Sequence, residues 1–182
     1  MSEVTNKYNF TNFKIHTQYS ICEGALKIEN LKDYTKTNKI KCLGISDTSN
    51  LSGALEFSES MSKVGTQPII GSQINFNFKN NYGLLTIVAK NKIGYQNLVE
   101  LSSLSYLNNK ELSLPTCDLS DLIKNKSGLI VMSGTVNGLI GKLFKNDKLD
   151  LIEEIYEKLF NNFGNNFYLE IQRHNDLNEK SF

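Results

Sequence analysis

Two histidines and one aspartate are the residues of this chain whose types and positions could form a metal or catalytic site. His16 ends the segment YNFTNFKIH, Asp47 follows the apolar run CLGIS, and His174 ends the segment NFYLEIQRH. Each segment has the pattern of a β-strand, and in parallel α/β folds the carboxyl ends of the strands converge on one site. Two imidazoles and a carboxylate can bind a divalent metal ion. Asp47 has an alternative role as the N-cap of the helix expected after it.

The other motifs in the sequence give weaker indications of a functional site. The glycines of VMSGTVNG (131–138) fit either a phosphate-holding turn or an ordinary connection from a strand to a helix, and we favour the ordinary connection. Cys22, Cys42 and Cys117 are odd in number and have no CxxC spacing, so we expect free and mostly buried thiols. The sequence contains no P-loop, GxSxG, HExxH or dinucleotide-binding fingerprint.

Composition indicates a globular protein without a membrane partner. The 182 residues are 40% hydrophobic and 21% charged, which suits one domain of ordinary size. No apolar run approaches the roughly 18 residues of a membrane span, and the first residues lack the layout of a signal peptide, so we expect a cytoplasmic protein. The net charge is +1, and Arg173 is the one arginine among 20 basic residues, which argues against tight DNA binding by this segment itself.

Strand and helix patterns alternate along the chain, which predicts an α/β fold with a mainly parallel sheet. The turn KNNYG is expected to join two neighbouring strands, and residues 108–117 are expected to form a loop. The chain stops soon after a strand, as a truncated barrel would. We expect strands at 8–16, 42–46, 67–78, 83–90, 128–134 and 166–174, and helices at 25–39, 50–65, 93–107, 118–125, 137–144 and 149–164.

Several stretches, in a fixed order over nearly the whole chain, resemble the N-terminal PHP (polymerase and histidinol phosphatase) domain of the bacterial DNA polymerase III alpha subunit. They are HTQYSICEGALKI, LGISDTSNLSGALEF, QPIIGSQI, TIVAKNKIGYQNLVELSSLSYL, GLIVMSGTVNGLIG and FYLEIQRH. The part AKNKIGYQNLVELSSLSYL is the most specific to the polymerase branch. The resemblance implies a PHP-type (β/α)7 barrel, similar to a TIM barrel. Residues 1–182 would then be a partial PHP domain, truncated before the last strand or strands.

The resemblance also implies a site at the carboxyl ends of the strands, where metal-competent relatives hold a cluster of divalent ions. His16, Asp47 and His174 are then remnant ligands. The positions that have lost a ligand or gained a positive charge are Asn12, Thr48, Gln73, Thr135 and Arg173. Amide and hydroxyl groups bind divalent ions weakly, and a guanidinium repels them. We therefore expect no catalytic residue and no metal cluster here, and at most one weakly bound Zn²⁺ or Mn²⁺. The strand ends at His16, Asp47, Gln73, Ser133 and His174 should share one rim of the sheet.

The resemblance implies that the parent protein is a DNA-directed DNA polymerase, a nucleotidyltransferase of DNA replication that uses Mg²⁺ and contacts DNA in a later region. This domain would then be a degenerate, metal-free module, inactive alone. It would support the rest of the alpha subunit and dock the proofreading exonuclease subunit within the replicase assembly. The alternative is a metal-dependent phosphoesterase or 3′–5′ exonuclease that acts at the strand-end site.

Overall fold

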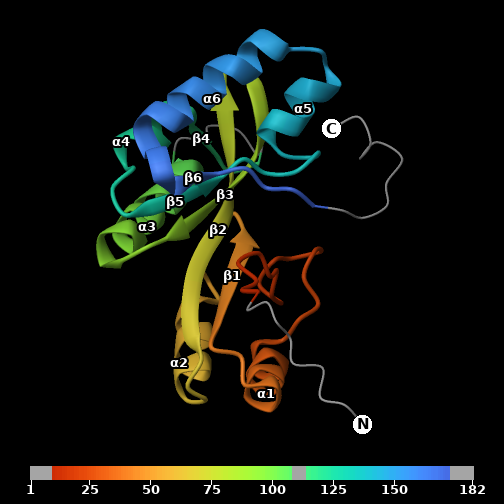
Figure 1. Ribbon diagram of the computed structural model, residues 1–182, viewed down its shortest axis with the longest axis vertical. Helices are drawn as coiled ribbons and strands as arrows, with labels where there is room; N and C mark the ends of the chain where they lie inside the picture. Colours follow the sequence, from red (N-terminus) through yellow and green to blue (C-terminus); the bar gives the residue numbers. More distant parts are fainter. Residues whose placement is uncertain (1–9, 108–113, 173–182) are drawn as a thin grey trace.

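The segment QPIIGSQINFNF forms a long strand, β2 (Gln67–Phe78), which is central to a mixed sheet (Figure 1). The computed structural model describes residues 10–107 and 114–172. Within these residues the sheet has six strands in the order β1-β2-β3-β5-β6, with β4 paired to β2 beside this path. The other five are β1 (Cys42–Thr48), β3 (Asn81–Ala89), β4 (Thr116–Asp118), β5 (Leu129–Met132) and β6 (Phe167–Tyr168).

The sheet is mainly parallel, because β3 is the one described strand that runs against the others. β2 pairs in parallel with β1 and β4, β3 is antiparallel to both β2 and β5, and β5 is parallel to β6. The predicted α/β class is therefore confirmed. The closed barrel that the family resemblance implies is not, because β1 and β6 stand at opposite ends of the sheet and do not pair within the described chain.

A two-residue turn joins β2 to β3, within the stretch KNNYG where the sequence predicts a turn between two strands. Lys79 and Asn80 both have positive φ angles, of 48° and 60°. Paired positive φ angles characterise the tight turns whose twist matches that of the flanking strands. Consequently no helix lies between β2 and β3, whereas helices precede β2 and follow β3.

Every helix expected from the sequence is present, with ends that differ by a few residues. The helices are α1 (Ile28–Asn38), α2 (Ala54–Ser62), α3 (Lys92–Leu107), α4 (Leu119–Lys124), α5 (Leu139–Lys145) and α6 (Leu149–Phe163), followed by the short 3-10 turn η1 (Gly164–Asn166). Asp118 caps α4 as predicted, through a reciprocal capping box with Asp121. None of the described helices is long and apolar enough to cross a membrane.

Two hydrophobic clusters form the core, one toward each end of the sheet. The larger cluster packs α3, α4, α5 and α6 against β2, β3 and β5 around side chains such as Phe76, Leu85 and Leu98. The smaller packs α1 and α2 against β1 around Phe57 and Met61. Figure 1 shows this division, with α1 and α2 at one end of β2 and α5 and α6 at the other. Ile70 of β2 packs against both clusters.

Three expected elements differ from the structure, all at the margins of the sheet. In place of a strand over 8–16, Ile15 forms a single parallel bridge with Ile45, and residues 1–9 lie outside the described chain. In place of a strand over 166–174, β6 ends at Tyr168. The stretch expected as a loop, 108–117, contains the start of β4, and its residues 108–113 are not described. The two edge segments have a pairing partner on one side only in the described chain, which weakens the ladder that defines a strand.

Candidate functional site

The register of the sheet brings distant residues into one row. Thr48 pairs with Gln73, Gln73 with Thr86, Thr86 with Met132, and Met132 with Tyr168. The ends of β1, β5 and β6 therefore lie level with the middle of β2. Gln73 does not end a strand, in contrast to the expectation, because β2 continues to Phe78 for its pairing with β3 and β4.

A cleft of about 440 Å³ opens beside this row. It brings together three residues singled out from the sequence, His16, Gln73 and Thr135. Asn12 does not line the cleft, and Arg173 and His174 lie outside the described residues. The full lining is Lys14, His16, Glu23, Gln73, Leu84, Gly134, Thr135, Asn137, Gly138 and Gln172.

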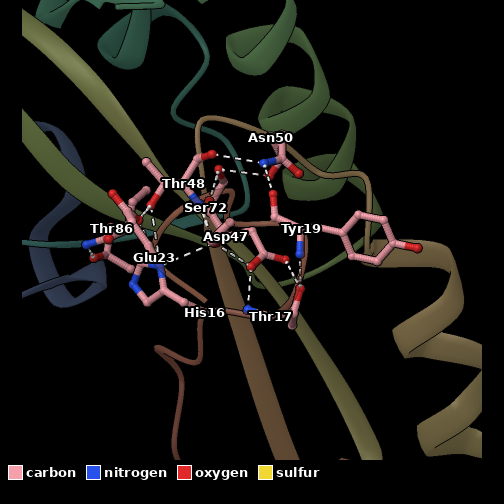
Figure 2. Close-up of polar contacts among 11 residues, drawn as sticks. His16, Thr17, Tyr19, Glu23, Asp47, Thr48, Asn50, Ser72 and Thr86 are labelled. Atoms are coloured by element: carbon pink, nitrogen blue, oxygen red, sulfur yellow. Dashed lines mark hydrogen bonds and ion pairs between the residues drawn. The ribbon is translucent and has the colours of Figure 1, made fainter. Parts of the chain in front are cut away.

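The imidazole of His16 faces a small polar cluster at one wall of the cleft (Figure 2). Its Nδ1 lies 3.3 Å from the Ser20 hydroxyl, 3.3 Å from the Thr48 hydroxyl and 3.4 Å from a carboxylate oxygen of Glu23. The Thr48 hydroxyl also donates to Glu23. Glu23 was not singled out from the sequence, although it lies in the same loop as His16 and its carboxylate contacts the imidazole.

Asp47 fastens that loop to the end of β1. Its side chain is buried, and its two carboxylate oxygens accept hydrogen bonds from the Thr17 amide at 2.6 Å, the Thr17 hydroxyl at 2.8 Å and the Ser20 hydroxyl at 2.6 Å (Figure 2). The N-cap of α2 is Gly53, so the alternative role of Asp47 as a helix cap is wrong. Asp47 is thus an anchor whose oxygens are already engaged by neighbouring donors.

An ion pair joins the two edges of the open sheet. Lys14 lies in the segment beside β1, Glu170 lies just beyond β6, and the Lys14 ammonium is 2.9 Å from Glu170 Oε1. The two side chains are 15% and 11% exposed. Gln172 donates to the same Glu170 oxygen at 2.6 Å, and the second oxygen, Oε2, is buried with no hydrogen-bond partner in the described chain.

The sequence contains a spacing signal for the residues around this ion pair. Lys14 and His16 are two residues apart in an extended segment, so they share a face, as do Glu170 and Gln172. The family-based assignment instead took Asn12 as the partner of His16. Asn12 is occupied elsewhere: its carbonyl oxygen accepts from the Gly44 amide at 2.7 Å, and its side-chain oxygen accepts from the Lys14 amide at 3.1 Å.

The turn from β5 to α5 also lines the cleft, and its glycines have a packing role. A Cβ on Gly134 would stand 2.9 Å from the Leu84 carbonyl oxygen, and a Cβ on Gly138 would meet the same oxygen at 2.9 Å. Gly134 also has a φ of +78°, which side chains disfavour. The glycines therefore let the turn lie against β3, which supports the ordinary strand-to-helix connection over a phosphate-holding turn.

The cysteines are free in the described chain and differ in burial. Cys117 is buried, and desolvation, followed by the nearby charges of Asp121 and Asp118, raises its pKa from 9.0 to about 12. Cys42 is half-buried and Cys22 is exposed, so the expectation of mostly buried thiols is wrong for Cys22.

The donor set of the cleft does not fit a cluster of divalent ions. Among residues 10–107 and 114–172, no group of three or more His, Cys, Asp and Glu side chains is placed to hold a metal ion. Gln73 and Thr135 are neutral, Asp47 is engaged by its loop, and Lys14 contributes an ammonium group to the lining. A multi-ion site needs several anionic or imidazole ligands to offset the repulsion between cations.

The sequence profile described as PHP domain matches residues 12–174. The chain belongs to the PHP domain family. Its PHP domain is 35% identical over 183 residues to the DNA polymerase III subunit alpha of Thermus aquaticus and 36% identical over 180 residues to that of Borreliella burgdorferi. These matches cover 93% and 91% of this chain but 15% of each relative, so the chain spans about 15% of the length of the curated relatives it matches.

A solved structure shows the same kind of fold at low sequence identity. An amidohydrolase from Chromobacterium violaceum superposes with a TM-score of 0.52 at 10% identity, over 87% of this chain and 84% of the other. The PHP domain described here is therefore a mixed α/β fold with an amidohydrolase as a structural neighbour.

Proposed function

We propose that this PHP domain, residues 1–182, is the amino-terminal part of a replicative DNA polymerase alpha subunit, and that it serves as a structural and docking module rather than a hydrolase. Support comes from its homology to DNA polymerase III alpha subunits. In this proposal DNA synthesis, with its Mg²⁺ ions and its DNA contacts, belongs to the rest of the parent chain, and the location is cytoplasmic.

The observation that carries the proposal is the ion pair between Lys14 and Glu170 at the cleft. A carboxylate in such a position could neutralise a bound cation, but here an ammonium from the same chain neutralises it at 2.9 Å. An added divalent ion would meet the repulsion of this fixed positive charge. The cleft is thus held together by the protein's own charges, as a structural module requires.

The docking part of the proposal concerns the proofreading exonuclease subunit. A polymerase whose own PHP domain does not hydrolyse phosphodiesters needs a separate exonuclease to remove misincorporated nucleotides. A rigid domain with a large apolar surface is a suitable platform for such a subunit. Exposed apolar side chains on the described surface include Leu55 and Ile93, at 72% and 56% exposure.

The second candidate function is a metal-dependent phosphoesterase or 3′–5′ exonuclease. The contact between His16 Nδ1 and Glu23 at 3.4 Å, beside an open cleft, favours this alternative. These two side chains could hold one ion together with His174, which lies outside the described residues. One ion of Zn²⁺ can be catalytic with three protein ligands.

Metal analysis and a hydrolysis assay on the full-length subunit separate the two functions. The subunit is dialysed against metal-free buffer, its Zn and Mn contents are measured, and hydrolysis of a nitrophenyl phosphodiester is followed with added Mn²⁺. We expect less than stoichiometric metal and no turnover, while primer extension with Mg²⁺ shows that the preparation is active. Two or more metal ions per chain, or turnover that His16→Ala abolishes, would refute the structural reading.

A further inference from the structure

A second groove shares no lining residue with the cleft described above. It has a volume of about 650 Å³ and runs between the first turn of α2 and the first turn of α3, over the start of β2 and the end of β3. Its lining is Phe13, Ala54, Leu55, Ser58, Gln67, Pro68, Ile69, Ile70, Val88, Ala89, Lys90, Asn91, Lys92, Tyr95 and Ile130.

The groove exists because the β2–β3 connection is a tight turn. In a strand–helix–strand unit the crossover helix would cover the strip of sheet between its two strands. Here α2 packs against β2, and α3 packs against β3 and also β2. The pairing of β2 with β3 begins at Gly71 and Val88, so the start of β2 before Gly71 has no β3 residue beside it and is left open. The burial of β2 shows the effect, since Gln67 to Ile70 are exposed or half-buried whereas Gly71 to Phe76 are buried.

The groove has a largely apolar lining. Pro68, Ile69 and Ile70 of β2 line it at the open start of the strand and are half-buried. Leu55 on one wall is 72% exposed, and Tyr95 on the other is 40% exposed. Contiguous apolar surface of this kind marks interaction sites more often than scattered exposed residues do.

The charge of the groove has one sign. Lys90 and Lys92 line the end near α3, and no acidic side chain is part of the described lining. Neither lysine forms an ion pair within the described chain, and the Lys90 ammonium donates to the neutral Asn166 side chain at 3.1 Å. A ligand that presents carboxylates next to apolar side chains would complement this surface.

The groove is poorly suited to binding a peptide as an added β-strand. The Gln67 amide donates to the Lys41 carbonyl, so the backbone of Gln67 faces β1 and that of Pro68 faces the open side. Pro68 has no N–H to donate, which removes the donor that strand addition would use first. Recognition must therefore occur through side chains, as it does when an amphipathic helix lies in a groove.

We infer that this groove, between α2 and α3, binds an acidic amphipathic helical segment of a partner subunit. The inference rests on the docking function proposed above and deepens it by naming the surface and the chemistry of the partner. Leu55 and Tyr95 contact the apolar face of the segment, and Lys90 and Lys92 contact its carboxylates.

The test uses the full-length subunit and two probes. The first probe is the exonuclease subunit, whose affinity is measured by surface plasmon resonance. The second is a pair of fluorescent peptides of about 16 residues, long enough to form a helix. Both peptides carry leucines at i, i+3 and i+7, and they differ in having glutamates or lysines beside the leucines.

The variants are Leu55→Asp and the double variant Lys90→Glu/Lys92→Glu. Matched controls are Leu149→Asp, a leucine in the first turn of α6 that is 56% exposed, and Lys124→Glu/Lys126→Glu, which has the same spacing. Lys126 resembles Lys90 because it donates to a neutral asparagine, Asn162. We expect about ten-fold weaker binding of the exonuclease and of the glutamate peptide for each groove variant, and wild-type binding for each control.

The outcomes separate the inference from the function on which it rests. If wild-type subunit binds the exonuclease and the groove variants bind it equally well, the groove inference is overturned and the docking function stands. If wild-type subunit does not bind the exonuclease, the docking function is refuted. The two peptides then test on their own whether the groove prefers an acidic helical ligand. Preference for the lysine peptide, or binding of neither peptide, overturns the inference. Self-association that Leu55→Asp abolishes assigns the groove to a second copy and also overturns it.

Discussion

Lys14 and Glu170 lie 156 positions apart in the sequence, and their side chains meet at 2.9 Å across the open edges of the sheet. One belongs to the segment beside β1 and the other to the segment after β6, so their contact links the two edges of the open sheet. With 15% and 11% side-chain exposure, the pair is shielded from most of the screening that weakens surface ion pairs.

Lys14→Met should destabilise the domain, because it leaves the Glu170 carboxylate buried without its cation. We expect the free energy of unfolding to fall by about 3 kcal/mol, at the low end of the roughly 3–5 kcal/mol for half-removed buried pairs, because both side chains keep some exposure. Urea unfolding measures this change, and the exposed Lys126→Met is the matched control. The double variant Lys14→Met/Glu170→Gln should recover part of the loss, and strictly additive effects would show that the pair contributes no coupling.

Asp47→Asn should loosen the loop that carries His16 and Glu23. The new amide can accept fewer hydrogen bonds, and its NH₂ group meets donors at Thr17 and Ser20, so one donor is left unsatisfied. We expect a loss of about 1–3 kcal/mol and faster hydrogen exchange at the Thr17 amide. The exposed Asp150→Asn is the control, and unchanged exchange at Thr17 would show that Asp47 is not the anchor.

Gly94→Ala should disrupt the packing of α3. A Cβ at this position would stand 1.8 Å from the Gly128 carbonyl oxygen, so either the helix or the turn before β5 must move. Alanine gains about 0.5–1 kcal/mol of helix propensity over glycine, but the clash should outweigh it and leave a net loss of about 1–3 kcal/mol. Thermal unfolding measures the change against the exposed control Gln96→Ala. A variant as stable as the wild type would contradict the close contact.

Cys117 should make the domain less stable at high pH. Its pKa is raised from 9.0 to about 12 in the folded state, so the folded chain holds the thiol proton more tightly than the unfolded chain. The resulting stabilisation is complete below pH 9 and is lost as the pH rises toward 12. We expect Cys117→Ala to reduce the loss between pH 8 and pH 10 by about 1 kcal/mol. Identical pH profiles for variant and wild type would contradict the raised pKa.

Metal affinity should return when the cleft regains ligands at the right positions. Lys14→His combined with Gln73→Glu and Thr135→His replaces one cation and two neutral side chains of the lining with metal ligands. We expect measurable Zn²⁺ binding by calorimetry and no hydrolytic activity. The control substitutes Asn12→His for Lys14→His. Equal affinity of both combinations would show that Lys14 is no closer to the site than Asn12, and tighter binding by the Asn12→His combination would place Asn12 at the site instead.

The sequence was sufficient to predict helices and strands whose turn residues or apolar periodicity favour the structure that the fold also requires. The β2–β3 hairpin follows from its turn residues, and α3 and α6 follow from their apolar periodicity. The edge strands of the sheet were harder to predict. Residues 10–16 alternate like a strand, but they can pair with a neighbouring strand on one side only. The three-residue β4 has no periodicity of its own and depends on its contact with β2.

The candidate site was predictable in part for a similar reason. Three residues singled out from strand ends and from the family motifs, His16, Gln73 and Thr135, line one cleft. The choice between Asn12 and Lys14 depended on how the first segment lies against β1, which the bridge between Ile15 and Ile45 sets. Glu23 contacts His16 within one loop, and Glu170 contacts Lys14 from the other end of the sequence. No short sequence motif predicts either contact.

The distance in sequence between Lys14 and Glu170 also determines when their ion pair can form during protein synthesis. A ribosome that adds about 5–20 residues per second makes Glu170 on the order of ten seconds after Lys14. During that interval the first segment can be held by the smaller cluster through Ile15, while the ammonium of Lys14 remains in water. The ion pair at the cleft therefore cannot form until Glu170 has emerged, well after the first segment has docked.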